Sequence, residues 1–365
     1  TRFRNVTGVQ TCALPISHFA SRAVILGHSY TDSTAGLEET IDGNIRYNQP
    51  SSFVNQLMAL LGLDKSNVKY LGKAGALLIG DATQTGYLGA VNFGGWVAPM
   101  QHILADANRA PYVSKSGLGI IAFGINDVQE FGLSSSNKYV NAYSEALRSV
   151  ISRLRAGKVV NAISGEPTIV ITGTHNFVTD TLVNSGGGYV EMHSDHGANQ
   201  TQITITIPAD YAGSGITLGF LADGDGLGGT ATIASSLPTQ TITTLNVTNA
   251  GNKTGMVVRL ALPATGTTQT IVITCTSLPP SGSVAFNYWQ IDSEIKNPIL
   301  VSTVAKLLTY TGLGSDAAVE AYNAAIASVC GEFERVEVAD WENALKADPH
   351  RICSDGIHPS ELGAS

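Results

Sequence analysis

The stretch Ala23-Val24-Ile25-Leu26-Gly27-His28-Ser29-Tyr30 decides the fold. Four consecutive apolar residues before a glycine are typical of a strand covered on both faces, as strands in a parallel α/β sheet are. Catalytic groups and ligands of such sheets gather at the carboxyl ends of the strands. Ser29 directly follows this strand and is therefore a candidate nucleophile; an ordinary turn serine is the alternative that this stretch alone leaves open.

Three later stretches supply the other groups that acyl transfer at a serine requires. Gly75 comes shortly after an apolar strand candidate, and its backbone N–H can donate to a developing oxyanion. Asn126 follows the strand expected over residues 118–123, and its side-chain amide can donate to the same oxygen. Asp355 stands three residues before His358, a spacing that lets the carboxylate orient the imidazole.

The chain resembles the SGNH (GDSL-like) hydrolase family through four motifs in the family's order: Gly27-His28-Ser29, Gly72-Lys73-Ala74-Gly75, Gly124-Ile125-Asn126-Asp127 and Asp355-Gly356-Ile357-His358. The resemblance implies that Ser29 is the nucleophile and that Asp355 and His358 form the catalytic pair. It implies an oxyanion hole made by the N–H groups of Ser29 and Gly75 and the amide of Asn126. It also implies a flavodoxin-like three-layer α/β/α core with a parallel sheet, working without metal or cofactor.

One position departs from the family pattern. His28 stands where these hydrolases usually carry an aspartate before the serine. That side chain is not one of the catalytic groups, so the implied mechanism stands, whereas assignment to a particular subfamily is weakened.

Composition restricts the partners of the chain. Its 365 residues carry a formal net charge of −8 and no Lys/Arg cluster, which argues against nucleic acid or an anionic membrane surface as a partner. The sequence has no run of about eighteen apolar residues, which is the pattern that predicts a membrane span. A neutral small or polymeric ester, such as an acylated glycan, fits better, and we expect a secreted protein.

Residues 1–17 are expected to be foreign to the protein, because Val6 to Ile16 looks like the translation of a sequencing-adapter oligonucleotide. The α/β core is then expected over residues 18–176 and 293–365. Within it, helical spacing predicts helices at 51–61, 139–154, 300–308 and 319–329, the second of them ended by Gly157. Residues 168–171 and 334–339 are expected to be its fourth and last strands.

Residues 177–292 differ in composition and are expected to form an inserted β-sandwich, jelly-roll-like in style. Short alternating segments separated by Gly, Pro and Asn turns predict strands at 202–207, 216–221, 230–233, 241–247, 256–262, 270–276 and 284–291. This style is shared with carbohydrate-binding modules, without a residue signature that can be carried over. Removal of residues 178–291 is expected to leave the α/β core folded, because the sandwich has hydrophobic faces of its own.

Several residues have both a functional and a structural interpretation. His28, Trp96 and His175 are candidates for the pocket lining, with a packed loop tryptophan and a hydrogen-bonded loop histidine as alternatives. Asp223 and Asp225 suit calcium or a plain acidic turn, and His193 to His196 suits zinc or a solvated loop. Cys330 and Cys353 form either a disulfide or two buried thiols.

These features predict a serine esterase, with carbohydrate O-deacylation as the expected activity. A lipase or polyester hydrolase of the same family is the alternative within enzymes. A non-catalytic glycan-binding protein is the alternative of another class.

Overall fold

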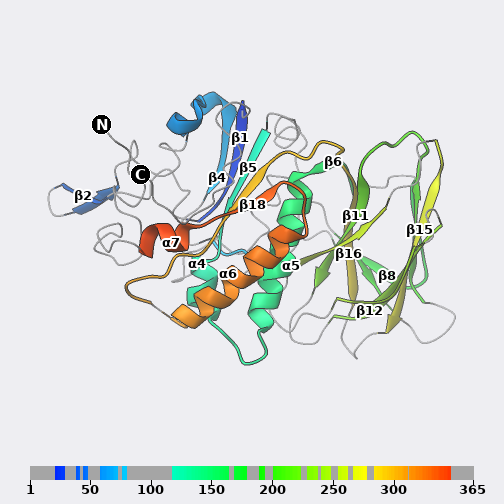
Figure 1. The fold of residues 1–365 in the computed structure, drawn as a ribbon. Coiled ribbons are helices and arrows are strands. Elements are labelled where there is room, and N and C mark those ends of the chain that lie inside the picture. Colours follow the sequence, from blue (N-terminus) through cyan, green and yellow to red (C-terminus); the bar gives the residue numbers. More distant parts are fainter. Residues whose placement is uncertain are drawn as a thin grey trace.

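The computed structural model describes residues 21–28, 38–41, 44–47, 58–72, 76–79, 117–163, 168–178, 189–193, 200–222, 228–236, 240–247, 254–261, 266–277, 283–310 and 312–346. One half is built on a 5-stranded parallel sheet and the other on two antiparallel sheets (Figure 1). The parallel sheet has the order β18-β17-β5-β1-β4. Its strands are β1 (Arg22–Gly27), β4 (Val68–Gly72), β5 (Gly117–Ala122), β17 (Ile299–Ser302) and β18 (Val336–Ala339).

Strand β1 lies inside this sheet and is covered on both faces, as its apolar run predicts. Val24 and Leu26 pack into the cluster that includes the helices after β5, whereas Ala23 and Ile25 pack on the other face against Met58. All four side chains are buried. The alternation of side chains along a strand thus joins the sheet to a layer on either side.

The order of the strands places a switch point beside β1. Along the chain, β4 pairs with one side of β1 and β5 with the other, both in parallel. Counted within this sheet alone, the spatial order is 2-1-3-4-5, in which ligands bind outside the carboxyl ends of the first and third strands. Gly27 at the end of β1 is in register with Gly72 of β4 and Ala122 of β5.

Helices α4 (Ile125–Phe131), α5 (Lys138–Leu154) and α6 (Asp316–Gly331) lie together on one side of the parallel sheet (Figure 1). Beyond the sheet edge lies α7 (Trp341–Lys346), and the short 3-10 helix η3 (Lys65–Asn67) precedes β4. The helix predicted to end before Gly62 does end there: residues 58–61 are helical and Gly62 has φ +66°. Such a left-handed glycine is a common helix stop.

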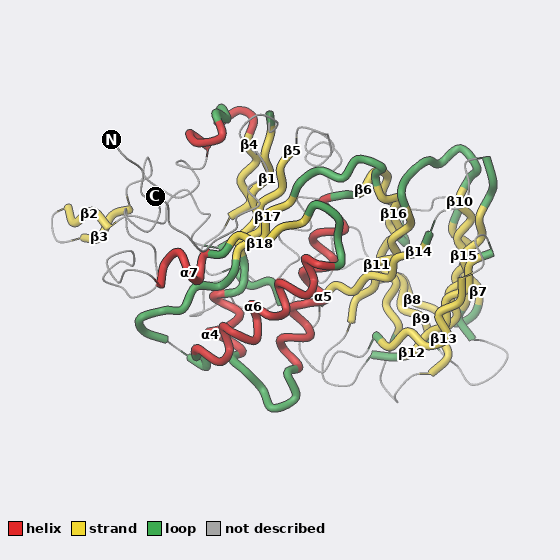
Figure 2. The backbone as a smooth tube through the Cα atoms, viewed as in Figure 1, coloured by secondary structure: helices red, strands yellow, loops and turns green. Residues whose placement is uncertain are grey.

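The second half is a pair of facing antiparallel sheets, seen edge-on in Figure 2. The first sheet has the order β13-β12-β15-β10-β7, and the second has β14-β11-β16-β9-β8, with β6 also paired to β16. Apolar residues of both sheets, among them Ile203, Ile273, Phe286 and Trp289, share one core. This arrangement agrees with the predicted β-sandwich.

The strands of the sandwich follow the chain from β6 to β16. They are β6 (Ala156–Asn161), β7 (Ile169–Thr172), β8 (His175–Val178), β9 (Tyr189–Met192), β10 (Gln202–Ile207), β11 (Gly215–Ala222), β12 (Thr230–Ser235), β13 (Gln240–Asn246), β14 (Thr254–Leu260), β15 (Gln269–Ser277) and β16 (Val284–Asp292). Each of the seven strands predicted between 202 and 291 is present, with ends shifted by no more than a few residues.

Two predictions about the core are wrong. Residues 168–171 do not continue the parallel sheet, because β7 pairs antiparallel with β10. The chain already enters the antiparallel sheets at β6, directly after α5, and Gly157 lies in that strand rather than at a helix end. A short apolar strand has the same local pattern in either kind of sheet, so only its pairing partner distinguishes them.

The predicted helix over residues 300–308 is also wrong. Residues 299–302 form β17, which pairs in parallel with β5 and β18. Ile299 and Val301 point to one face of the sheet and Leu300 to the other, as in a strand. A small hairpin of β2 (Glu38–Ile41) and β3 (Asn44–Tyr47) lies between β1 and β4 in the sequence.

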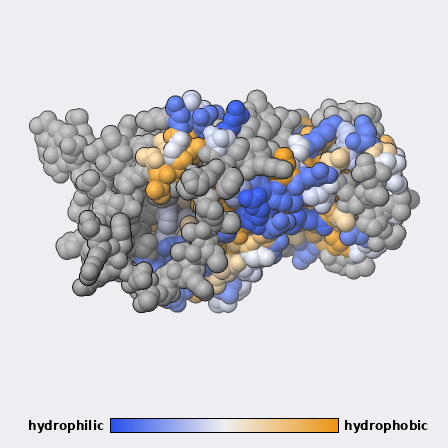
Figure 3. All heavy atoms as spheres, turned by 45° about the horizontal axis from the view of Figure 1, so that its top comes forward, coloured by the Kyte–Doolittle hydropathy of each residue, from blue (hydrophilic) through white to orange (hydrophobic). Residues whose placement is uncertain are grey.

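The two halves meet along α5 through buried polar groups. Fully buried Arg153 donates to the side chain of Gln290 at 3.2 Å and lies 3.7 Å from the ring centroid of Tyr288. Gln290 in turn donates to Asp292 at 2.8 Å and to the carbonyl of Ser152 at 2.9 Å. Figure 3 shows hydrophilic residues, in blue, gathered on the described surface between the two halves.

Among the residues that the structure describes, no helix combines the length and apolar character that a membrane span needs.

Candidate functional site

The candidate site lies at the carboxyl edge of the parallel sheet, beside the switch point. β1 ends in Gly27, and the backbone N–H of His28 still donates to the carbonyl of Ala122 in β5 at 3.3 Å. This bond holds the two strand ends side by side. The residue after His28 is Ser29, and Asn126 follows Ala122 by four residues.

The turn after β5 needs a glycine. Gly124 has φ +123°, and a Cβ added there would lie 2.5 Å from Cγ2 of Val304. The hydroxyl of buried Tyr143 donates to the carbonyl of Phe123 at 3.0 Å. The backbone that leads into α4 is therefore fixed from the strand side, by Val304, and from the helix side, by Tyr143.

Asn126 is buried in the first turn of α4, with 6% of its surface exposed. Its Nδ2 donates to the carbonyl of Ala76 at 2.9 Å. A primary amide carries two N–H bonds, so one can hold the 76–79 segment while the other donates to a second acceptor. This geometry suits an oxyanion donor whose side-chain rotamer is fixed by a hydrogen bond to the backbone of Ala76.

Asp127 ties the same segment down by its carboxylate. Its Oδ1 accepts from the backbone N–H groups of Leu78 and Ile79, both at 2.9 Å, and its Oδ2 accepts from Leu78 at 3.1 Å. The side chain is fully buried. Burial raises the pKa of Asp127 to about 7, although the hydrogen bonds from Ile79 and Leu78 act in the opposite direction.

Sequence reasoning assigned no role to Asp127. The sequence holds one signal for it: Asp127 is an acidic residue in the run from Phe123 to Val128, whose other residues apart from Asn126 are apolar. An ionisable side chain in such a run has to find buried hydrogen-bond donors. Here these donors come from a segment 48 and 49 residues earlier in the chain, which local patterns do not reveal.

Asn126 and His28 are the predicted site residues that the structure describes at this sheet edge. Asn126 is bonded to Ala76, the residue after Gly75, and His28 precedes Ser29 at the end of β1. The other predicted site residues lie outside the described part of the chain: Ser29, Gly75, Trp96, Asp355 and His358. His28 itself is buried, with 3% of its surface exposed.

His175 was proposed for the pocket because it follows residues 168–171. Since those residues belong to an antiparallel sheet, that reason no longer holds. His175 lies in β8, where its Nδ1 is 2.9 Å from the carbonyl of Gly173 and its ring packs edge-on against Phe177. It is a hydrogen-bonded histidine of the sandwich.

Of the remaining candidates, Asp223, Asp225, His196 and Cys353 lie outside the described residues. Nε2 of His193 is 3.1 Å from Nδ2 of Asn176 and 4.0 Å from a carboxylate oxygen of Glu191. Within the described ranges no group of His, Cys, Asp or Glu has the arrangement of a metal site. Cys330 is a free, buried thiol in α6, and burial raises its pKa to about 12.

No protein-family model matches the sequence, and no curated protein matches it either. Among solved structures, the hemagglutinin-esterase of porcine torovirus aligns over 95% of this chain and 87% of its own, at 10% identity and a TM-score of 0.42. A family 35 carbohydrate binding module from Clostridium thermocellum aligns over 37% of this chain and 98% of its own, at 17% identity and a TM-score of 0.28.

The exo-beta-1,3-galactanase of Phanerochaete chrysosporium aligns over 37% of this chain and 29% of its own, at 15% identity and a TM-score of 0.26. This chain thus matches less than a third of the galactanase. The structural neighbours include a viral esterase, a glycosidase and a carbohydrate binding module, each at a TM-score below 0.5.

Proposed function

We propose that the protein is a serine esterase of the SGNH type. One observation supports the proposal: Asn126 is bonded to Ala76 just beyond β5, the strand that pairs with β1, and Ser29 follows β1 by two residues in the sequence. The described residues His28, Ala76 and Asn126, which belong to or adjoin three of the motifs, thus support a site at the carboxyl ends of β1 and β5, where this strand order binds ligands. An oxyanion hole needs donors from separate segments held in this way.

The proposed chemistry uses only residues of this chain. His358, oriented by Asp355, takes the proton of Ser29, and the alkoxide attacks the ester carbonyl. The N–H groups of Ser29 and Gly75 and the second N–H of Asn126 hold the oxyanion. His358 then protonates the leaving alcohol, and water activated by the same imidazole resolves the acyl-enzyme.

The fold supports a division of the chain that differs from the sequence prediction at one boundary. We place the core at residues 18–155 and 293–365, as a flavodoxin-like α/β/α unit, and the jelly-roll-like insertion at 156–292. The pairing of β6 with β16 supports the earlier boundary. The insertion then leaves the core at the end of α5 and returns just before β17, at the amino ends of the parallel strands.

We propose that the substrate is a neutral acylated glycan outside the cell and that the reaction is carbohydrate O-deacylation. The net charge of −8 disfavours polyanionic substrates. The inserted sandwich offers a second surface with which a polymeric substrate can be held. Lipid and polyester substrates are the outcomes that the following test separates from this one.

The test is a series of initial rates on p-nitrophenyl esters from acetate to palmitate, beside acetate release from acetylated xylan. The proposal predicts turnover that is greatest for the short acyl groups, together with release of acetate from the glycan. A maximum at long acyl chains assigns a lipase-type or polyester-type activity. No turnover of any ester, with binding of the glycan retained, contradicts the esterase and favours a glycan-binding protein.

A further inference from the structure

Two consecutive residues of α4 hold one short segment of the chain at separate points. Asn126 donates to the carbonyl of Ala76 at 2.9 Å, and Asp127 accepts from the backbone N–H groups of Leu78 and Ile79, each at 2.9 Å. All five residues are buried. Because the carboxylate and the amide share this partner segment, a shift of the segment also moves the acceptor that Asn126 uses.

The carboxylate is the group that satisfies the far end of this segment. The N–H groups of Leu78 and Ile79 both donate to Oδ1 of Asp127, and Leu78 also donates to Oδ2 at 3.1 Å. A backbone N–H that is buried without an acceptor is unfavourable. Residues 76–79 are therefore expected to shift when this carboxylate is removed.

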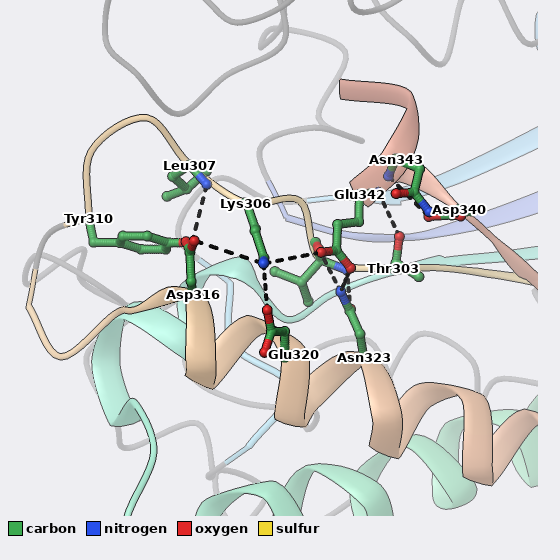
Figure 4. A network of polar contacts seen from close by, with 11 residues as sticks. Thr303, Lys306, Leu307, Tyr310, Asp316, Glu320, Asn323, Asp340, Glu342 and Asn343 are labelled. Atoms are coloured by element: carbon green, nitrogen blue, oxygen red, sulfur yellow. Dashed lines mark hydrogen bonds and ion pairs between the residues drawn. The ribbon is translucent and has the colours of Figure 1, made fainter. Parts of the chain in front are cut away.

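The turn before Asn126 is held by a separate set of contacts. Asn323 of α6 accepts from the N–H of Val304 at 2.7 Å and donates to its carbonyl at 2.9 Å, within the polar network of Figure 4. Val304 packs against Gly124, where an added Cβ would lie 2.5 Å from its Cγ2. The tie to residues 76–79 can therefore be removed while the contacts of Val304 stay in place.

The charge of Asp127 also differs from that of its neighbours in how it responds to pH. Tyr143 of α5 and Tyr322 of α6 interact electrostatically with Asp127; burial, and then this charge, raises the pKa of both, so both stay neutral near pH 7. Burial raises the pKa of Asp127 itself to about 7. A neutral carboxyl accepts more weakly than a carboxylate, so the tie to residues 76–79 weakens as pH falls through this value.

We propose that Asp127 is a positioning residue for the oxyanion hole: its ionised carboxylate holds residues 76–79 so that the carbonyl of Ala76 fixes the amide of Asn126. The inference rests on the proposed function, in which Asn126 is an oxyanion donor. With one N–H of Nδ2 bonded to Ala76, the direction of the other N–H is set by the same acceptor. Asp127 acts on the reaction through this acceptor, without touching the substrate.

The test is a double-mutant cycle between Asp127→Ala and Asn126→Ala, with initial rates measured on p-nitrophenyl acetate. We expect Asp127→Ala to lower kcat by about thirtyfold and to change KM by less than about threefold, because a misplaced catalytic group costs rate rather than binding. In the Asn126→Ala background the same change is expected to cost less than about threefold, because the donor that it positions is already gone.

Asp127→Asn separates the charge from the hydrogen bonds. Its amide oxygen can accept from Leu78 and Ile79 at every pH, so kcat near pH 8 is expected to stay within about threefold of wild type. Wild-type turnover requires a neutral catalytic imidazole and an ionised Asp127, so the ascending limb of kcat/KM is expected to be steeper than one titration allows. In Asp127→Asn the limb should have the slope of one group. This comparison still tests the proposal if Asp127→Ala is poorly folded.

Asp292→Ala is the matched control. Asp292 is also a buried carboxylate, which accepts from Thr217 at 2.9 Å and from Gln290 at 2.8 Å, but it lies in β16 of the sandwich. The control is expected to lower the free energy of unfolding and to leave kcat and the slope of the limb unchanged.

Three outcomes overturn the positioning role. They are equal losses in both Asn126 backgrounds, a wild-type kcat in folded Asp127→Ala, and a wild-type limb that is no steeper than the limb of Asp127→Asn. A wild-type kcat in the Asn126→Ala single variant instead overturns the oxyanion assignment on which the inference rests.

Discussion

Asn126 serves two acceptors in the proposed mechanism, and the order of these roles matters. One N–H is bonded to Ala76, which holds the amide plane in place. A donor that does not have to reorient during the reaction stabilises the oxyanion more than a mobile one. The burial of Asn126 strengthens this effect, because competing water is largely excluded.

Asn126→Ala is predicted to lower kcat by about a hundredfold or more, the usual range for losing one oxyanion donor. The variant also loses the bond to Ala76, so its urea denaturation has to be measured beside its kinetics. Tyr143→Phe is the control, since it removes the bond to Phe123 in the same turn without removing an oxyanion donor. A kcat for Asn126→Ala that is no lower than that of Tyr143→Phe contradicts the oxyanion role.

Asp127 is predicted to make the stability of the protein depend on pH. Its pKa is about 7 in the folded protein because of burial, against an ordinary value of 3.8. The folded state therefore binds more protons than the unfolded state between these values, and the free energy of unfolding falls as pH rises through this window. The fall is at most about 4 kcal/mol, from the roughly three units between the two values.

Asp127→Asn keeps an oxygen that can accept from Leu78 and Ile79 and removes the titration. Guanidinium denaturation at pH 5 and pH 8 should show that the variant gains stability relative to wild type at the higher pH. A difference between the two proteins that is the same at both pH values shows that Asp127 does not titrate in this range.

Sequence motifs point to Asn126 because its proposed role lies in a short local pattern. They did not identify Asp127, whose partners Leu78 and Ile79 come from a distant segment. Burial and long-range hydrogen bonds are properties of the folded chain, so Asp127 could not be assigned from the sequence.

At the scale of elements, the pair of β11 and β16 shows how closely the sandwich is packed against α5. A Cβ added to Gly219 would lie 2.1 Å from the ring of Tyr288. That ring lies under the guanidinium group of Arg153, which is itself fully buried. The ring of Tyr288 is therefore in contact both with β11, at Gly219, and with α5, at Arg153.

Gly219→Ala is predicted to lower the free energy of unfolding by about 1–3 kcal/mol through overpacking. Gly331→Ala at the end of α6, where a Cβ would meet nothing within 4 Å, is expected to range from neutral to a gain of about 1 kcal/mol. Denaturant titrations of both variants test this contrast. A neutral Gly219→Ala shows that the junction beneath Tyr288 is looser than the geometry indicates.

The elements that the sequence predicted well are those whose period is strong over their whole length. The alternation in β10 and the helical spacing of α5 and α6 are clear in the sequence, and all three elements lie close to their predicted limits. β7 and β17 are four-residue apolar strands, for which period two and period 3.6 are hard to separate. Tertiary pairing decides which sheet β7 joins, and it also decides that residues 299–302 form a strand rather than a helix.

At the scale of the whole molecule, the sandwich is joined to the core more firmly than its sequence suggests. The expected independence of residues 178–291 does not fit the structure, because β6 and β7 lie before residue 178 and would lose β16 and β10. Arg153 would lose Gln290 as well. Removing a hydrogen-bond partner from a buried charged group is destabilising.

Replacing residues 178–291 by a short Gly/Ser linker is therefore predicted to destabilise the core rather than leave it intact. We expect low soluble yield or loss of a cooperative thermal transition, and with it loss of p-nitrophenyl acetate turnover. Excision of 156–292 with Arg153→Met is the control, since it removes the orphaned strands and the buried arginine together. A cooperative transition in the shorter excision, close to that of wild type, contradicts the role of the junction.

The most direct test of the central claim, that Ser29 is the nucleophile at this sheet edge, is covalent labelling by a serine-directed fluorophosphonate, followed by intact mass and peptide mapping. We predict a single phosphonyl adduct on Ser29 that forms in step with the loss of esterase activity and is absent from Ser29→Ala, which stays folded and inactive. An adduct on another residue, or a Ser29→Ala variant that hydrolyses p-nitrophenyl acetate at the wild-type rate, would contradict it.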